Sequence, residues 1–209
     1  MTGISIFALI IGAIFVNNVV LAQFLGICPF LGVSKDVKSS LGMGGAVLFV
    51  MLLATMVTYL IMQYVLVPLN LEYLQTIAYI LVIAALVQMV EIILKKVSPA
   101  LYQALGVFLP LITTNCAILG VAILVAQGTY NSQGLEPNLL TGVVFAVSTA
   151  LGFGLALTIF AAIREQLAMM DVPKGMQGMP IALVVAGLLA MAFMGFGGVD
   201  NGLAKVFGL

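Results

Sequence analysis

Apolar residues fill six long stretches of the chain, and short polar or charged segments separate them. A helix that crosses a lipid bilayer needs roughly 20 consecutive, mostly apolar residues, and each stretch is close to that length or longer. The pattern therefore predicts an all-α integral membrane protein with six transmembrane helices. The expected spans are residues 4–26, 41–66, 73–94, 101–126, 139–163 and 179–196.

The composition extends this interpretation to the whole chain, residues 1–209, as a single transmembrane domain. Hydrophobic residues make up 64% of the chain and charged residues only 7%, whereas a soluble domain carries roughly 25% charged residues. So few charges cannot keep a domain of this size in water, so its solvent must be lipid. The net charge of zero gives no basic face for nucleic acid, and the absence of His excludes imidazole metal ligands and a Ser-His-Asp site.

Basic residues gather in alternate loops between the predicted spans. Six of the seven fall after spans one, three and five, namely Lys35, Lys38, Lys95, Lys96, Arg164 and Lys174. The loops near Leu69 and near Asn131 contain none. Loops rich in Lys and Arg stay in the cytoplasm. We therefore expect these three loops to be cytoplasmic and both termini to lie on the outer face.

A short motif occurs twice and contains both of the cysteines in the chain. Residues 28–33 and residues 116–121 both read Cys-x-x-Leu-Gly-Val. Each motif lies in or just after the first span of one half, and two more spans follow it. The chain is therefore predicted to consist of two three-helix repeats, residues 1–96 and 97–209. Because each repeat has an odd number of spans, the second enters the membrane inverted, and functional sites of such proteins lie near the midplane.

Polar residues and prolines surround each cysteine. Asn17 and Asn18 precede Cys28 and Pro29 follows it, whereas Pro110, Thr113, Thr114 and Asn115 precede Cys116. Proline disrupts a helix interior because it lacks the backbone donor, and polar side chains can satisfy backbone groups that a helix break frees. We expect the first helix of each repeat to be interrupted, with Asn18 and Asn115 close to the cysteines.

The two cysteines allow three interpretations. Each can be a small buried hydrophobe, the two can form a buried disulfide, or they can bind a metal. A disulfide explains neither the polar breaks nor the duplication. Thiolates suit iron–sulfur clusters, copper(I) and zinc, and an iron–sulfur cluster normally needs four cysteines, so another subunit would have to supply two. Half-helix N-termini aimed at such a cluster would offset part of its negative charge.

Other residue types offer less chemistry. Glu91 lies four residues before Lys95, which favours a helix-surface pair at the membrane rim, with a proton or cation site as the alternative. No two carboxylates share the middle of a span. Small residues let membrane helices approach closely, and this role is expected of the glycines of spans two and five, Gly42, Gly44, Gly45, Gly152 and Gly154.

The residues around both cysteines resemble the A-type membrane subunits of Rnf electron-transport complexes. The similar segments are Asn17-Asn18, residues 24–34, residues 108–118, Ile163-Arg164-Glu165 and Asp171-Val172-Pro173, and the likeness covers essentially the whole chain. A related family, the E subunits of the sodium-pumping NADH:quinone reductase, usually lacks Pro after the first Cys and has Val between Thr and Asn before the second. Pro29 and Thr114 therefore favour Rnf.

This resemblance implies a function that the pattern alone does not give. Rnf complexes transfer electrons between reduced ferredoxin and NAD, coupled to sodium or proton transport across the bacterial inner membrane. Their A-type subunits are expected to share an intramembrane [2Fe-2S] cluster with a homologous, oppositely oriented E-type partner. Cys28 and Cys116 match its ligand positions. Asn18, Pro29, Thr114 and Asn115 are expected to support the ligands or to break the helices.

The resemblance also implies which chemistry belongs elsewhere. The flavins, the NAD site and the ferredoxin-type clusters belong to other Rnf subunits among B, C, D and G, so this chain would be one subunit of a translocase without a complete active site. Two alternatives remain open from the residues. The chain can be an E-type subunit of the quinone reductase, or a stand-alone secondary transporter with inverted repeats and incidental cysteines.

Overall fold

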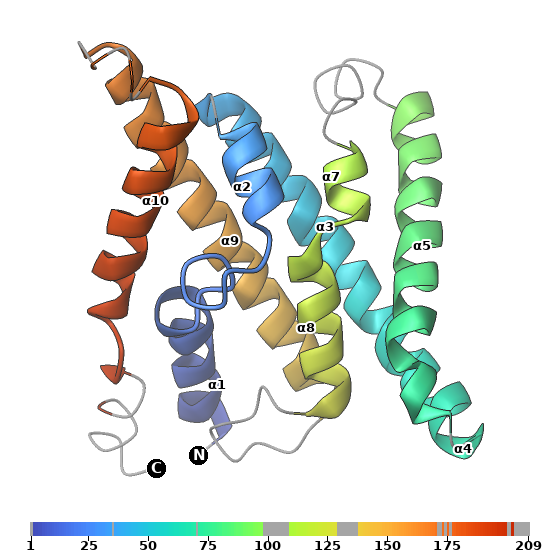
Figure 1. The fold of residues 1–209 in the computed structure, drawn as a ribbon. Coiled ribbons are helices and arrows are strands. Elements are labelled where there is room, and N and C mark those ends of the chain that lie inside the picture. The colour runs from blue at the N-terminus through green and yellow to red at the C-terminus, as the bar shows by residue number, and fades with distance from the viewer. Residues whose placement is uncertain are drawn as a thin grey trace.

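The computed structural model describes residues 2–34, 36–69, 71–97, 109–128, 138–170, 173, 175, 177–199 and 202. Every regular element in these ranges is a helix, and the long helices run side by side in one bundle (Figure 1). The all-α prediction is confirmed for this part of the chain. Four predicted features lie outside the described residues: residues 101–108 of the fourth span, Lys35, Lys174 and the loop near Asn131.

The six predicted apolar stretches all contain helix. Within the described residues, four segments are long and apolar enough to cross a membrane, and two more are shorter apolar helices. The four long segments are Val37–Leu69, Gln75–Ile93, Pro110–Gln127 and Leu139–Ala168, and the two shorter ones are Ser5–Val16 and Met179–Met194. The two shorter helices belong to the first and sixth predicted spans. The first span is short because its helix is interrupted.

The helices follow one another up and down the bundle (Figure 1). Their bounds are α1 Thr2–Ile11, the π-helical η1 Gly12–Val16, α2 Ile27–Val33, α3 Val37–Ile61, the π-helical η2 Met62–Leu66, α4 Val67–Leu69, the 3-10 turn η3 Glu72–Leu74, α5 Gln75–Val97, α7 Leu109–Thr113, α8 Cys116–Gln127, α9 Leu139–Ala168 and α10 Met179–Met194. The first residues of α1 and the last residues of α10 lie at the same end of the bundle (Figure 1). An even number of passes, as predicted, has this consequence.

Helices α3 and α9 form the centre of the bundle and make its most extensive helix–helix contact. Two glycines permit their close approach, because a Cβ atom on Gly44 would lie 3.2 Å from the Cα atom of Gly154. Gly152 is equally close to another backbone, with its would-be Cβ 3.1 Å from the Cα atom of Ile14. Gly42 and Gly45 make no such close contact within the described part of this chain, because their added Cβ atoms would have nothing within 4 Å.

The described basic residues of the loops and helix ends cluster at one end of the bundle. Lys38 lies in the first turn of α3 and Lys95 and Lys96 in the last turn of α5. Arg164 lies near the end of α9. The start of α3 and the ends of α5 and α9 lie at the same end of the bundle (Figure 1). This arrangement agrees with the alternation seen in the sequence, and the assignment of this end to the cytoplasm stays a prediction.

Candidate functional site

The first predicted span is two helical segments joined by a loop inside the bundle. The chain leaves helical geometry after η1 and returns to it in α2, so residues 17–26, called here the first break, are non-helical. The loop satisfies part of its own backbone. The carbonyl of Asn18 accepts from Ala22 N at 2.9 Å, and the carbonyl of Val19 accepts from Leu25 N at 2.9 Å. The predicted interruption of this span is confirmed.

The side chain of Asn18 holds the first break in place. It is fully buried, and its Nδ2 donates to the carbonyls of Ile14 at 3.0 Å and Gly152 at 2.9 Å. Its Oδ1 accepts from the backbone N–H groups of Val20 at 3.1 Å and Leu21 at 3.3 Å. Asn18 thus bonds its own loop and α9, and none of these partners is a cysteine. It supports the break without reaching either thiol directly.

The second predicted break is much shorter. Helix α7 ends at Thr113 and α8 begins at Cys116, so the second break consists of Thr114 and Asn115. Thr114 Oγ1 donates to the carbonyl of Pro110 at 2.9 Å. Asn115 Oδ1 accepts from Ala117 N at 3.0 Å, which makes Asn115 the N-cap of α8. The predicted interruption of this span is also confirmed.

Pro29, one of the two prolines expected to break the helices, stands near the start of the half-helix that follows the first break. Pro29 is the third residue of α2, and Pro110 is the second residue of α7 as described. The first four N–H groups of a helix have no intrahelical partner, so proline loses nothing there. Pro29 thus lies just after the first break, and its predicted role in breaking the helix stays a prediction. The turns that precede α2 make the interruption.

Both cysteines are free thiols that are exposed in the isolated chain. The interpretation as buried hydrophobes is therefore wrong, and the two do not form a disulfide. Each lies in the first turn of a half-helix, Cys28 as the second residue of α2 and Cys116 as the first residue of α8. The backbone N–H of Gly26 donates to Cys116 Sγ at 2.9 Å. One hydrogen bond thus joins the first break to the cysteine of the second.

Gly26 makes this junction possible, and it was not among the residues predicted to support the site. Its φ of +78° lies in the left-handed region that favours glycine. An added Cβ would lie 2.9 Å from Phe153 Cε2 and 3.2 Å from both Ala117 Cβ and Asn115 Oδ1. The local signal was a glycine within an apolar run, two residues before Cys28. Asn115, as predicted, therefore lies close to the cysteine region.

The exposed thiols alone do not make a complete metal site. Within the described residues, no three His, Cys, Asp or Glu side chains group closely enough to hold a metal ion. A cluster bound at Cys28 or Cys116 would thus need ligands from another chain. The exposure of both thiols leaves them accessible to such a partner.

Arg164 has a structural role that its sequence position did not reveal. Its Nη1 donates to the carbonyl of Leu31 at 2.9 Å and to Ser34 Oγ at 3.0 Å. Its guanidinium carbon also lies 5.7 Å from the centre of the Phe160 ring, which stacks on Phe30 at 4.3 Å. These contacts attach α9 to the C-terminal end of α2. A cation at that end also complements the helix dipole.

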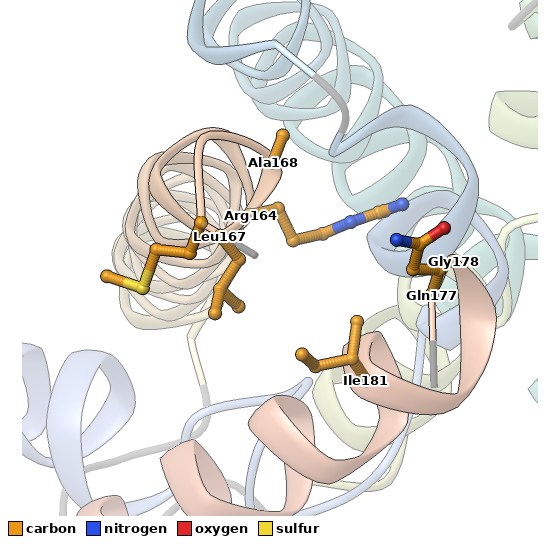
Figure 2. Close-up of a pocket in the computed structure, with 7 residues that line it drawn as sticks. Arg164, Leu167, Ala168, Gln177, Gly178 and Ile181 are labelled. Atoms are coloured by element: carbon orange, nitrogen blue, oxygen red, sulfur yellow. The ribbon is translucent and has the colours of Figure 1, made fainter. Parts of the chain in front are cut away.

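A cavity of about 350 Å³ lies beside Arg164, at the basic end of the bundle. Its lining comes from the end of α9, the loop that follows and the start of α10: Arg164, Leu167, Ala168, Met170, Gln177, Gly178 and Ile181. Figure 2 shows Arg164 reaching from α9 across one side of this cavity toward Gln177. Because neither cysteine lines the cavity, it is separate from the candidate metal centre.

The fold and the two cysteines define a class of protein: a helical membrane protein in which two interrupted helices each present an exposed cysteine. The chain belongs to the Rnf-Nqr family, described as "Rnf-Nqr subunit, membrane protein", which matches residues 6–200. The family resemblance of the residues around the cysteines is therefore confirmed, and the chain is a multi-pass membrane protein.

Relatives similar over nearly the whole chain carry more specific names. The A subunit of the Na(+)-translocating ferredoxin:NAD(+) oxidoreductase complex of Acetobacterium woodii is 58% identical over 194 residues, which are 93% of this chain and 97% of the relative. The A subunit of the ion-translocating oxidoreductase complex of Syntrophotalea carbinolica is 55% identical, over 95% of this chain and 99% of the relative. The corresponding protein of an Escherichia coli strain is 52% identical, over 91% and 95%.

Proposed function

We propose that this chain is the A subunit of an Rnf-type complex, which couples electron transfer between ferredoxin and NAD to sodium or proton translocation. The relatives described above support this assignment because they match almost end to end and all are A subunits. The same comparison favours Rnf over the E subunit of the sodium-pumping quinone reductase. The reacting groups for ferredoxin and NAD belong to other subunits, among B, C, D and G.

Within this complex, Cys28 and Cys116 supply two of the four ligands of a [2Fe-2S] cluster shared with a homologous, oppositely oriented subunit. The single observation that carries this proposal is that both thiols are exposed and lie in the first turns of interrupted helices. A thiolate there lies near the positive end of the helix dipole. When bound, the cluster would supply a one-electron carrier inside the membrane.

The residues around the cysteines fit such a group. Thiolates are the ligands that iron–sulfur clusters require, and the Gly26 N–H already donates to the sulfur of Cys116. Asn115 Nδ2 is a buried donor without a hydrogen-bond partner among the described residues. The other predicted supporting residues act on the backbone. Asn18 fixes the loop before α2, and Thr114 bonds the last turn of α7.

The two halves of the chain, residues 1–96 and 97–209, are proposed to be inverted repeats with both termini on the outer face. The first helix of each half is interrupted close to its cysteine. The second helices of the two halves, α3 and α9, meet at the centre of the bundle through Gly44 and Gly154. A two-fold relation between repeats would bring equivalent helices together in this way.

The test is to purify the chain with its homologous partner subunit from cells with intact iron delivery. We expect an iron–sulfur absorption band and, after reduction, the EPR signal of a [2Fe-2S] cluster. Cys28→Ser and Cys116→Ser should each remove or strongly change this signal. The matched control is Ala22→Ser, an exposed position in the same first break, which should leave the signal unchanged. A signal that survives either cysteine substitution removes that cysteine as a ligand.

A stand-alone secondary transporter is the second candidate, because interrupted helices near a repeat interface are also typical of transporters. The same preparation separates the two functions. A colourless wild-type sample that carries no iron, although the cells load other iron–sulfur proteins, would favour the transporter. The genes next to this one provide an independent check, since an Rnf complex predicts five neighbouring subunits.

A further inference from the structure

Only one of the two polar atoms in the Asn115 side-chain amide has a hydrogen-bond partner among the described residues. Its oxygen caps α8 by accepting from Ala117 N at 3.0 Å. Its nitrogen is buried and has no hydrogen-bond partner within the described part of the chain, and the residue as a whole is only 4% exposed. The orientation of the amide is fixed by the cap, because only the oxygen can accept from a backbone N–H. The nitrogen is therefore a donor that lacks an acceptor.

The surroundings of this donor point to one acceptor. Asn115 immediately precedes Cys116, and its Oδ1 lies 3.2 Å from the Cβ position of Gly26, whose own N–H donates to Cys116 Sγ. Gly26 is thus the shared neighbour of the Cys116 sulfur, which accepts from its N–H, and of the Asn115 amide, which packs against its Cα. A thiol sulfur is a weak acceptor, whereas a thiolate ligand is negative and accepts charge-assisted hydrogen bonds.

We propose that Asn115 is a positioning residue whose side-chain N–H becomes the second donor to the Cys116 sulfur and, with the Gly26 N–H, sets the cluster's reduction potential. This inference rests on the proposed ligation of a [2Fe-2S] cluster. Hydrogen bonds to cluster sulfurs tune the potential. They stabilise the reduced state more, because it carries one more negative charge, and so they raise the potential.

The contrast with Asn18 shows why this amide is singled out. Asn18 donates twice and accepts twice, so its amide has no remaining role. Asn115 has the same chemistry in the other break, but only its oxygen is used.

The first measurement is a potentiometric EPR titration of the complex that carries Asn115→Ser or Asn115→Asp. Both residues keep a cap oxygen for Ala117 N, but neither presents the amide donor. We expect the midpoint potential to fall in both variants, and to fall further in Asn115→Asp because of the added negative charge. The expected fall for Asn115→Asp is at least a tenfold change in the one-electron equilibrium, about 59 mV.

Asn138 provides the matched control. It is also a helix N-cap, of α9, and its side chain takes part in a capping box with Thr141 at the opposite end of that helix from Arg164. Asn138→Ser and Asn138→Asp make the same chemical changes away from the cysteines. We expect both to keep the wild-type midpoint potential. An equal fall in the Asn138 variants would overturn the proposal, because it would show a general effect on the bundle.

The second measurement detects the contact itself. The complex is grown with asparagine labelled with ¹⁵N in the side-chain amide, and pulsed EPR (HYSCORE) of the reduced cluster reports weakly coupled nitrogen nuclei. We expect a ¹⁵N coupling in the wild type that Asn115→Ser abolishes and Asn138→Ser retains. A midpoint potential and a ¹⁵N coupling that are unchanged in Asn115→Ser would overturn the role of Asn115, while the wild-type cluster signal would leave the proposed function intact. A wild type without any cluster would overturn both.

Discussion

Both breaks interrupt a predicted span next to a cysteine, but they differ in length and in the number of hydrogen bonds that their asparagines make. The first break occupies residues 17–26, contains a buried asparagine with four hydrogen bonds, and reaches α9 through Gly152. The second break has two residues, and its asparagine forms one side-chain hydrogen bond, within its own helix. The four hydrogen bonds of Asn18 hold the first break in one conformation, so this break is a structural scaffold. The second keeps an unused donor beside its cysteine.

The asparagines of the two breaks therefore differ in role: one stabilises the fold and the other retains a donor for a ligand. Buried polar groups destabilise a fold when they are left unpaired, so a fully bonded amide is a structural device. An amide that is buried and only partly bonded costs free energy unless an absent group completes it. Asn18 therefore supports the architecture, whereas Asn115 keeps the donor that we propose for the candidate site.

The largest expected effect tests the first break. Asn18→Ala leaves two carbonyls and two N–H groups without their side-chain partner inside the bundle. We expect the free energy of unfolding to fall by about 4 kcal/mol, since each buried unpaired group costs about 1–3 kcal/mol and part of the loop can relax. The measurement is SDS-induced unfolding of the purified protein in mixed micelles, followed by circular dichroism. The neighbouring exposed Asn17→Ala should change it by less than about 0.5 kcal/mol, and equal losses would refute the scaffold role.

The second effect tests the junction between the breaks. Gly26→Ala places a Cβ in a left-handed backbone conformation and 2.9 Å from Phe153 Cε2. We expect a loss of about 3 kcal/mol, from about 1–2 kcal/mol of backbone strain and about 1–3 kcal/mol of overpacking, in the same unfolding assay. Gly187→Ala is the control, because an added Cβ there meets nothing within 4 Å in the helical α10. It should be neutral or stabilise by up to about 1 kcal/mol. Equal behaviour of the two variants would contradict the close contact at Gly26.

A smaller effect is expected at the second break. Asn115→Ala removes one cap hydrogen bond and also removes the unpaired donor. We expect a loss of about 1 kcal/mol, the usual contribution of an N-cap. Asn138→Ala, which removes the cap of α9, should cost a similar amount in the same titration. A loss at Asn115 as large as that at Asn18 would remove the distinction between scaffold and site.

The smallest effect is expected one residue earlier. Thr114 is exposed and donates only to the carbonyl of Pro110, one turn back in α7. Thr114→Ala should change the unfolding free energy by less than about 0.5 kcal/mol, as is usual for exposed positions. Thr158→Ala, which removes the same kind of bond to the carbonyl of Gly154 within α9, is the reference. A loss above about 2 kcal/mol would show that the second break is also a scaffold.

The sequence predicted the number of apolar segments and the places where two of them are interrupted. Helix α9 begins at the predicted residue, Leu139, because a polar N-cap precedes an apolar run there. The extent of the first break was not predictable, since Val19, Val20 and Leu21 are as apolar as any helical residue. Hydropathy indicates that a segment lies in lipid, but it does not indicate whether the backbone of that segment is helical.

Two features of the site lay beyond local patterns. Burial was one of the three interpretations open for the cysteines, and both are exposed. Their apolar neighbours could not decide this, because a surface that faces lipid or another membrane protein is as apolar as a core. The bond of Arg164 to Leu31 joins residues more than a hundred positions apart. No spacing rule within a helix detects such a contact. The role of Gly26 depends on a partner, Cys116, that is 90 positions away in the sequence.

The attachment of α2 has a mechanical consequence. This helix has 7 residues, so it is about 10 Å long. Arg164 holds the carbonyl of Leu31 and the hydroxyl of Ser34 at one end, and Cys28 lies at the other. Gly26 precedes the Cys28 end and packs against α9 too, since a Cβ added to it would lie 2.9 Å from Phe153 Cε2. The helix is therefore a short strut fastened to α9 at both ends. A displacement of α9 near Arg164 would therefore be transmitted along α2 to Cys28, so the basic end of the bundle and the candidate metal centre are geometrically linked.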